Sequence, residues 1–201
     1  MSDSRLSVDF VFGVLNTRRA SSAARRSTSS SSEPALSVVD MTDLAKHPAV
    51  ALALGNMVVV WSRAETAMMV ALAWATKMPV DMTSSAFYHI PTFDSRVKML
   101  LAVLSDCPVA PSLKAAMIHK IEALSRLSKT RNTFVHHTWI VDENTNNISI
   151  VDHRKPPRSR ITPVKSIDIM NHVVAVRKRT MTLEGLFDWT DLVFSSPHTL
   201  P

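Results

Sequence analysis

Cysteine and glycine are nearly absent from this sequence. The 201 residues include one cysteine, Cys107, and 3 glycines. A single cysteine excludes an intramolecular disulfide framework and any zinc site built on cysteine pairs, which fits a reducing compartment. Scarce glycine argues against turn-rich all-β folds and against glycine loops that cradle phosphates. With 46% hydrophobic residues and 11 methionines, the composition favours one helical globular domain.

Long hydrophobic runs are also missing. No uninterrupted apolar run reaches about 18 residues, the length that a membrane-spanning helix needs. The most apolar stretch carries Arg63 and Glu65 near its middle, where each charge would cost roughly 2.5–3.5 kcal/mol in a bilayer. We therefore expect no membrane association. Because the sequence shows no strong leader either, the expected location is the cytoplasm.

The first 40 residues differ in composition from the rest of the chain. They contain Arg18-Arg19, Arg25-Arg26 and a serine-rich run before Pro34. Segments of this kind bury too little apolar surface to order themselves. We expect residues 1–40 to form a disordered Ser/Arg-rich tail and residues 41–196 to form the folded domain.

A long helix is expected from Pro48 to Pro79, because this stretch has almost no turn formers between its two prolines. Its apolar residues recur every three or four positions and form one stripe, which consists of Leu54, Val58, Trp61, Met68 and Leu72. Glu65 lies on the same stripe. A loop is expected between Pro79 and Pro91.

Three further helices and a hairpin complete the expected fold. The second helix is capped by Thr92 or Asp94. The third begins near Ser112, and its row of inward residues consists of Met117, Ile121, Leu124, Arg131 and Val135. Apolar runs on both sides of residues 144–147 predict a β-hairpin, and Ser166 caps the last helix. The expected fold is all-α: an up-and-down four-helix bundle with a small β-hairpin before the last helix.

Positive charge is concentrated in one part of the chain. Residues 120–179 contain 12 Lys/Arg and 5 Asp/Glu, a net charge of +7 in a chain whose total is +6. A localised basic field suits a polyanion such as RNA. The residues expected to contact phosphates are Arg154, Lys155, Arg158, Arg160, Arg177, Lys178 and Arg179. The alternative is a basic face that is simply solvated.

Charge, amide and imidazole side chains meet near the end of the third helix. This segment contains Arg131, Asn132, His136 and His137. At 100° per residue Asn132 and His136 share a face, whereas Arg131 and His136 are about 140° apart. Arg131 and His136 can flank one cleft if the helix end frays, or if two copies meet across a two-fold axis.

Arginine and histidine together form a minimal set for cleaving an RNA phosphodiester without a metal. Histidine can take the proton of the 2′-hydroxyl or protonate the leaving oxygen, because its unperturbed pKa lies near neutrality. Arginine can hold the phosphate and its developing charge in a forked grip. A purely structural pair at a helix end is the alternative.

The segment from Arg131 to His136 resembles the signature of the HEPN superfamily, the higher eukaryotes and prokaryotes nucleotide-binding helical domains. That signature is an arginine, a polar residue, three further residues and a histidine, and Arg131, Asn132 and His136 occupy its three positions. The order of the expected helices over residues 48–194 is also similar to that family. Only the six-residue motif is specific, since many helical bundles share the rest of the pattern.

The resemblance implies a small helical domain that forms a homodimer and brings two motifs together. It implies a metal-independent endoribonuclease in a toxin–antitoxin, defence or RNA-processing system, with RNA as substrate and an antitoxin protein as a further partner. Arg131 and His136 would be the catalytic pair, and Asn132 the polar residue that orients them. Some members of the family bind nucleotides or partner proteins without cleaving them, so a non-catalytic scaffold is the alternative. An unrelated helical bundle is a third reading.

Two further residues are expected to support the site. Glu65 needs a partner on its apolar stripe, so we expect it to pair with Arg131 or with another cation of a neighbouring helix. This pairing serves stability, and it would also hold Arg131 for a phosphate. His137 faces about 100° away from His136 and either contacts substrate or caps a carbonyl.

Neither the tryptophans nor the histidines indicate a cofactor. Trp61, Trp74 and Trp139 can stack on bases, but core packing explains Trp61 and Trp74 better because their neighbours are apolar. No histidine pair has a zinc spacing with a third ligand. We expect no metal and no cofactor.

Overall fold

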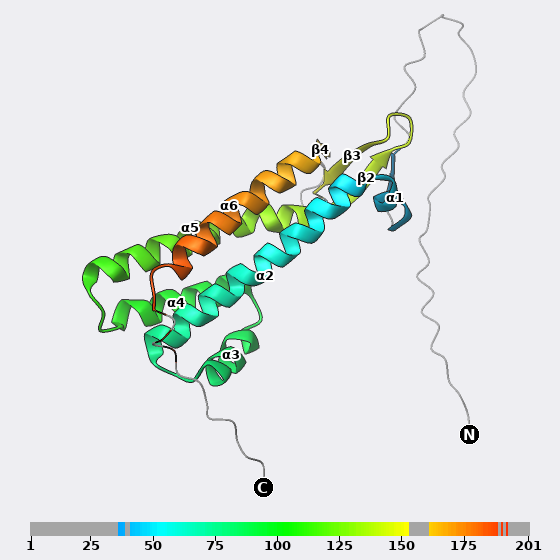
Figure 1. The fold of residues 1–201 in the computed structure, drawn as a ribbon. Helices are drawn as coiled ribbons and strands as arrows, with labels where there is room; N and C mark the ends of the chain where they lie inside the picture. The colour runs from blue at the N-terminus through cyan, green and yellow to red at the C-terminus, as the bar shows by residue number, and fades with distance from the viewer. Residues whose placement is uncertain (1–35, 39–40, 153–160, 189, 191, 193–201) are drawn as a thin grey trace, which may run out of the picture. The chain divides into compact units, whose positions relative to one another are not determined.

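The protein is mostly helical in the part of the chain that the computed structural model describes, which is residues 36–38, 41–152, 161–188, 190 and 192. This part contains six helices and four strands. In chain order they are β1 (Leu36–Val38), α1 (Met41–Lys46), α2 (Pro48–Thr76), α3 (Val80–His89), α4 (Phe93–Asp106), α5 (Pro111–His136), β2 (Thr138–Asp142), β3 (Asn147–Val151), β4 (Ile161–Pro163) and α6 (Ser166–Glu184) (Figure 1).

Helix α2 confirms the long helix expected after Pro48. Pro48 occupies its first turn, where the missing N–H costs no hydrogen bond. The helix stops where Lys77 takes a left-handed φ of 57°, which ends the hydrogen-bond ladder. In length and composition α2 is able to cross a membrane, a property that the core helix of a globular protein shares, and 61% of its most apolar window is buried inside the protein.

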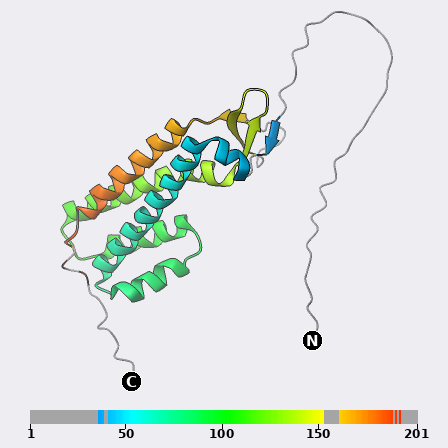
Figure 2. The same ribbon diagram turned by 45° about the vertical axis from the view of Figure 1, so that its right-hand side comes forward.

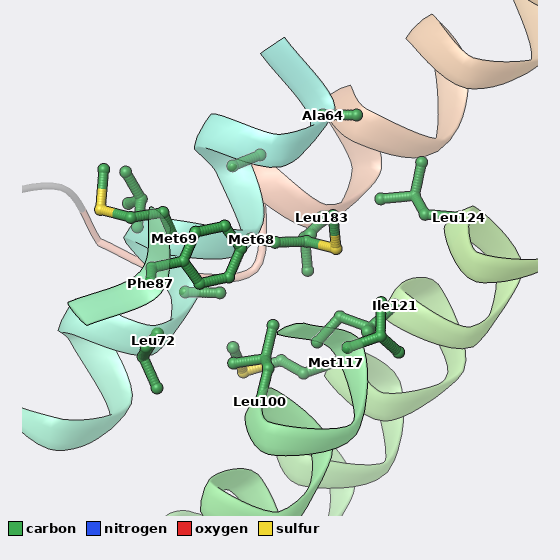
Figure 3. Packing of buried hydrophobic residues seen from close by; sticks show 14 of the residues in the cluster. Ala64, Met68, Met69, Leu72, Phe87, Leu100, Met117, Ile121, Leu124 and Leu183 are labelled. Carbon is green, nitrogen blue, oxygen red and sulfur yellow. The ribbon is translucent and has the colours of Figure 1, made fainter. Parts of the chain in front are cut away.

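The larger hydrophobic core lies between α2, α3, α4, α5 and α6. Met68 of α2, Leu100 of α4 and Leu183 of α6 are fully buried in it, and Met117 and Ile121 of α5 pack opposite them (Figure 3). These residues belong to the inward faces that the helical periodicity predicts.

A smaller core joins the first half of α2 to the sheet. The sheet is antiparallel with strand order β1-β2-β3-β4. Its side chains Ile148 and Ile150 pack against Ala53 and Met57 of α2 and against Phe134 near the end of α5. The end of α5 is therefore fixed between the sheet and the first half of α2.

Helices α2 and α6 lie side by side and run in the same direction (Figures 1 and 2). Ile169, in the first turn of α6, belongs to the smaller core with the first half of α2. Leu183, in the last turn of α6, belongs to the larger core with the second half of α2. Both helices therefore start at the sheet end of the domain.

Helix α3 is absent from the expected fold and changes the course of the chain. Residues 80–89 are poor helix formers between two prolines, but Thr83 and Phe87 are buried on one face and hold the helix by tertiary packing. The chain returns along α3, so Phe93 at the start of α4 lies 4.8 Å from Trp61. The expected loop between Pro79 and Pro91 is wrong, because this segment is helical.

The expected hairpin is confirmed as β2 and β3, but it belongs to a larger sheet. The short edge strands β1 and β4 have only three residues each, which is too short for a visible alternation. The fold is therefore mostly helical and not all-α. Strand β1 also lies within residues 1–40, so the folded domain begins before residue 41.

Three single-residue expectations differ from the structure. Val58 and Val135 were expected to face inward, but they are 60% and 40% exposed because each lies at the edge of its helix's buried face. Ser166 is the first helical residue and not the N-cap. Lys165 is the N-cap, and its backbone N–H donates to the Asp168 carboxylate at 2.9 Å. Thr92 caps α4, as expected.

Candidate functional site

Arg131 lies against the face of a tryptophan from another helix. Its guanidinium carbon is 5.9 Å from the centre of the Trp61 ring, within the range of a cation–π contact. Its Nη1 donates a hydrogen bond of 3.2 Å to Oδ1 of the neighbouring Asn132. Arg131 is half-buried and Asn132 is exposed. The guanidinium is therefore held in place while part of it still faces solvent.

Glu65 supports this arrangement through Trp61 and forms no hydrogen bond or ion pair with Arg131. The indole Nε1 of Trp61 donates to Oε1 of Glu65 at 3.2 Å, one turn further along α2. Glu65 also pairs with Arg96 of α4, with Nη1 and Oε1 3.6 Å apart. Of the two partners expected for Glu65, the structure shows the cation from a neighbouring helix.

Arg96 is the residue that the sequence reasoning missed. Its Nε donates to the carbonyl of Ile90 at 2.9 Å, and its guanidinium lies 5.5 Å and 5.2 Å from the ring centres of Phe87 and Tyr88. The available signal was its position one turn before the inward-facing Leu100, at the edge of the α4 apolar face. Arg96 thus connects α3, α4 and α2, and it is linked to the Arg131 contact through Glu65 and Trp61.

His136 is the last residue of α5 and is exposed. Its ring has no hydrogen bond or ion pair with any residue that the structure describes. Because α5 remains helical from Arg131 to His136, the two side chains leave the helix about 140° apart. The structure shows the helix end unfrayed, so within one copy the two side chains do not share a face.

His137 turns away from the motif. It is the C-cap of α5, and its backbone N–H donates to the carbonyl of Thr133 at 3.4 Å. Its Nε2 lies 3.6 Å from a carboxylate oxygen of Asp152, and both side chains are largely buried. Of its two expected roles, the structure favours the structural one.

The tryptophans are used for packing. Trp61 and Trp74 are 4% and 7% exposed, which confirms their expected place in the core. Trp139 is half-buried against the smaller core, and its Nε1 donates to the carbonyl of Phe134 at 2.8 Å. Because Trp61 is 4% exposed and contacts both Phe93 and Arg131, it is unavailable to stack on a base.

The expected phosphate-contacting residues are only partly described. Arg154, Lys155, Arg158 and Arg160 lie outside the described residues. The residues of the second group are all exposed on α6; they are Arg177, Lys178 and Arg179. Since consecutive helical residues point about 100° apart, this group does not form one face.

Two cavities lined by described residues lie away from the motif. One of about 420 Å³ is lined by residues of β2, β3 and β4, among them Ile148 and Ile161. Another of about 230 Å³ lies between α2, α3 and α4 and is lined by apolar side chains such as Leu72 and Val103. Among the described residues, no group of three or more His, Cys, Asp and Glu side chains is placed to hold a metal ion.

The site thus consists of one supported cation, one amide and one exposed imidazole on the last two turns of α5. Its chemistry is limited to binding an anion at Arg131 and to proton transfer at His136. No protein-family model, no curated protein and no solved structure matches this chain.

Proposed function

We propose that this protein is a metal-independent endoribonuclease of the HEPN type that acts as a homodimer. Arg131 and His136 are the catalytic pair in this proposal, and Asn132 orients Arg131. RNA is the substrate, in a toxin–antitoxin, defence or RNA-processing role. In the terms of that family, α2, α4, α5 and α6 correspond to the four helices of the bundle, and α3 is an additional connection.

One observation carries the proposal: a supported, half-exposed arginine and an unpartnered, exposed histidine stand on one rigid helix end. Arg131 is held by Trp61 and Asn132, and these contacts reduce the ordering that phosphate binding must still supply. His136 has no partner among the described residues that would compete with a substrate. Such an arrangement suits a site completed by a second copy, which adds a second pair.

The reaction needs no group beyond these side chains and water. The 2′-oxygen attacks the adjacent phosphorus while His136 of one copy takes the 2′-hydroxyl proton. The bond from phosphorus to the 5′-oxygen breaks, and that oxygen takes a proton from a water molecule, to which the protonated His136 then gives its own. Arg131 binds the non-bridging oxygens, where negative charge develops. The products carry 2′,3′-cyclic phosphate and 5′-hydroxyl ends.

The exposed cations of α6 and the basic segment 154–160 would bind RNA phosphates outside the reacting bond. Contacts of this kind position the strand without reading its sequence. We expect the cleavage rate at low substrate concentration to fall steeply with salt, because each phosphate contact releases counterions.

The test is cleavage of a mixed-sequence RNA in the presence of chelator by the wild-type protein, His136→Ala and Arg131→Ala. We expect cleavage by the wild type, with 2′,3′-cyclic phosphate ends, and a loss of at least a hundredfold in each variant. His119→Ala and Arg126→Ala are matched controls, because both residues are exposed on the same helix. Equal activity in His136→Ala and His119→Ala would show that the motif is not catalytic.

A non-catalytic scaffold is the second candidate, and the series Arg131, Trp61, Glu65, Arg96 favours it. Two cations joined through an aromatic ring and a carboxylate across three helices stabilise a helix end without any chemistry. This reading predicts that wild-type protein binds RNA, a nucleotide or a partner protein without cleavage. It also predicts that Arg131→Ala lowers the melting temperature, while His136→Ala, which removes no contact, leaves it unchanged.

A further inference from the structure

The outer side of the α2–α6 pair carries a line of apolar side chains from each helix. The five residues are 53–69% exposed, and they are Leu52 and Val59 of α2 and Ile167, Val174 and Met181 of α6. Within each helix they recur every seven positions, so each set forms a line along one face. We call these five residues the outer strip.

Contacts across the helix pair place the two lines next to each other. Asn56 Nδ2 of α2 lies 4.0 Å from Met170 Sδ of α6. Leu52 and Val59 lie about 40–60° from Asn56 around α2, and Ile167 and Val174 lie about 40–60° from Met170 around α6, in both cases towards solvent. Because the helices run in the same direction, residues 52 and 59 are close in height to 167 and 174. The two lines therefore border one outer seam.

The charge beside the outer strip is positive. Arg63 of α2 is neutralised by two hydrogen bonds to Glu184, of 3.0 and 2.7 Å. Arg177 and Lys178 are exposed, and neither forms a hydrogen bond or ion pair with a residue in the described part of the chain. The other acidic residues of these two helices are Glu65, which pairs with Arg96, and Asp168, whose carboxylate caps the start of α6. Arg179 of α6 likewise has no side-chain partner among the described residues, but only Arg177 and Lys178 lie within one turn of both Val174 and Met181.

We propose that the outer strip binds an acidic amphipathic α-helix of a partner protein. A partner helix that lies in the seam meets an apolar side chain of α2 and of α6 at intervals of seven residues. This spacing matches the heptad period of apolar residues on an amphipathic helix. The strip extends from residue 167 to 181 of α6, about 21 Å, which corresponds to four helical turns. Carboxylates on the flank of the partner helix would face Arg177 and Lys178.

Charge and area decide between this partner and a second copy of the chain. A second copy would bring the same unpaired cations against the strip, whereas an acidic helix neutralises them. The five side chains offer on the order of 100 Å² each, so an occupied strip buries roughly 1,000 Å² in total, which is the lower range of specific interfaces. The proposal does not depend on the ribonuclease activity.

The probe is a fluorescein-labelled 21-residue peptide with Leu at heptad positions a and d, Glu at e and g, and Ala elsewhere. Fluorescence anisotropy with the full-length protein is expected to show saturable binding. The same peptide with Lys at e and g should bind at least tenfold more weakly. Replacing both Val59→Ser and Val174→Ser should weaken the acidic peptide about tenfold, and Arg177→Glu with Lys178→Glu should reverse the preference between the peptides.

Matched controls separate the strip from the general surface. Arg179→Glu makes the same change of charge at a position about 160° around α6 from Met181. Met82→Ser removes an exposed apolar side chain from α3. Both should leave peptide binding and thermal melting unchanged. Equal binding of the two peptides, or no effect of the valine pair in a folded variant, overturns the proposal. The proposal is also overturned if the Val59→Ser/Val174→Ser variant keeps peptide binding but loses self-association or binding to phosphatidylserine vesicles.

Discussion

His172 is a buried titratable side chain on the face of α6 towards α5. It is 5% exposed, and its ring packs against Phe134 with the ring centres 6.2 Å apart. Its Nε2 has no hydrogen-bond partner within the described part of the chain. Burial lowers the pKa of His172 from its ordinary 6.5, because the charged ring would lose its hydration. The folded state therefore favours the neutral form.

We expect this residue to make the protein less stable in mild acid. Below pH 6.5 the unfolded chain binds a proton at His172 that the folded protein does not, so the free energy of unfolding falls as the pH decreases. Above pH 6.5 both states are neutral, and the effect vanishes. Urea unfolding of the wild type and of His172→Leu from pH 8 to pH 5 measures this difference.

The exposed His119 of α5 is the control for this experiment. His119→Leu should keep the acid dependence of the wild type, whereas His172→Leu should have a flatter profile. Profiles of equal slope for the wild type and His172→Leu would show that His172 is protonated equally in the folded and unfolded states.

The residues of the candidate site were predictable as far as they lie on one helix. Helical geometry alone places Asn132 and His136 on one face and separates Arg131 from it, and the unbroken α5 agrees with that geometry. The contact between Arg131 and Trp61 was not predictable, because it depends on how α2 is rotated against α5. A periodic pattern defines the buried face of a helix but not which edge of it meets a given neighbour.

At the scale of elements, α3 shows how one buried aromatic residue holds a short helix. Phe87 is fully buried, and Arg96 lies over its ring. Phe87→Ala leaves a cavity beside α2 and α4, so we expect the free energy of unfolding to fall by about 3–5 kcal/mol. Chemical denaturation measures this value.

Tyr88 provides the comparison for Phe87, because it is the next residue and is 42% exposed. Tyr88→Ala should cost much less than Phe87→Ala. If the two variants were destabilised equally, α3 would not depend on the packing of Phe87.

The start of α4 depends on a side-chain cap. Thr92 Oγ1 accepts a hydrogen bond of 3.1 Å from the backbone N–H of Ser95. Thr92→Ala leaves that N–H without its partner and should lower the free energy of unfolding by about 1 kcal/mol. Thr92→Ser keeps the acceptor, so its denaturation midpoint should stay close to that of the wild type. A loss of the same size in both variants would contradict a capping role.

The elements with strong signals of their own were predictable, and those held by neighbours were not. Helices α2 and α5 begin at prolines, and α6 buries Ile169, Val173 and Val176 at helical spacing. Strand β4 is exposed along its whole length and exists through its pairing with β3. Such edge elements carry no periodicity that a single sequence can reveal.

For the whole molecule, the proposed activity requires two copies, and two inactive variants should therefore complement each other. Arg131→Ala and His136→Ala are each expected to be inactive. A dimer that contains one of each still has one intact arginine and one intact histidine at the shared site. We expect an equal mixture, after exchange of subunits, to regain cleavage well above that of either variant alone. A mixture that stays inactive although mixed dimers form would indicate that each copy needs its own pair.

Helix α3 adds one reversal of chain direction. The chain therefore crosses the domain an odd number of times between the start of α2 and the end of α6. As a result, β1 and the start of α2 lie at the end of the domain that holds the end of α5, while α6 finishes at the opposite end. A fluorescent protein or affinity handle joined after α6 would therefore leave the domain away from the sheet end, where His136 lies. The same handle joined before β1 would emerge at the sheet end, next to the strand that follows His136 and His137.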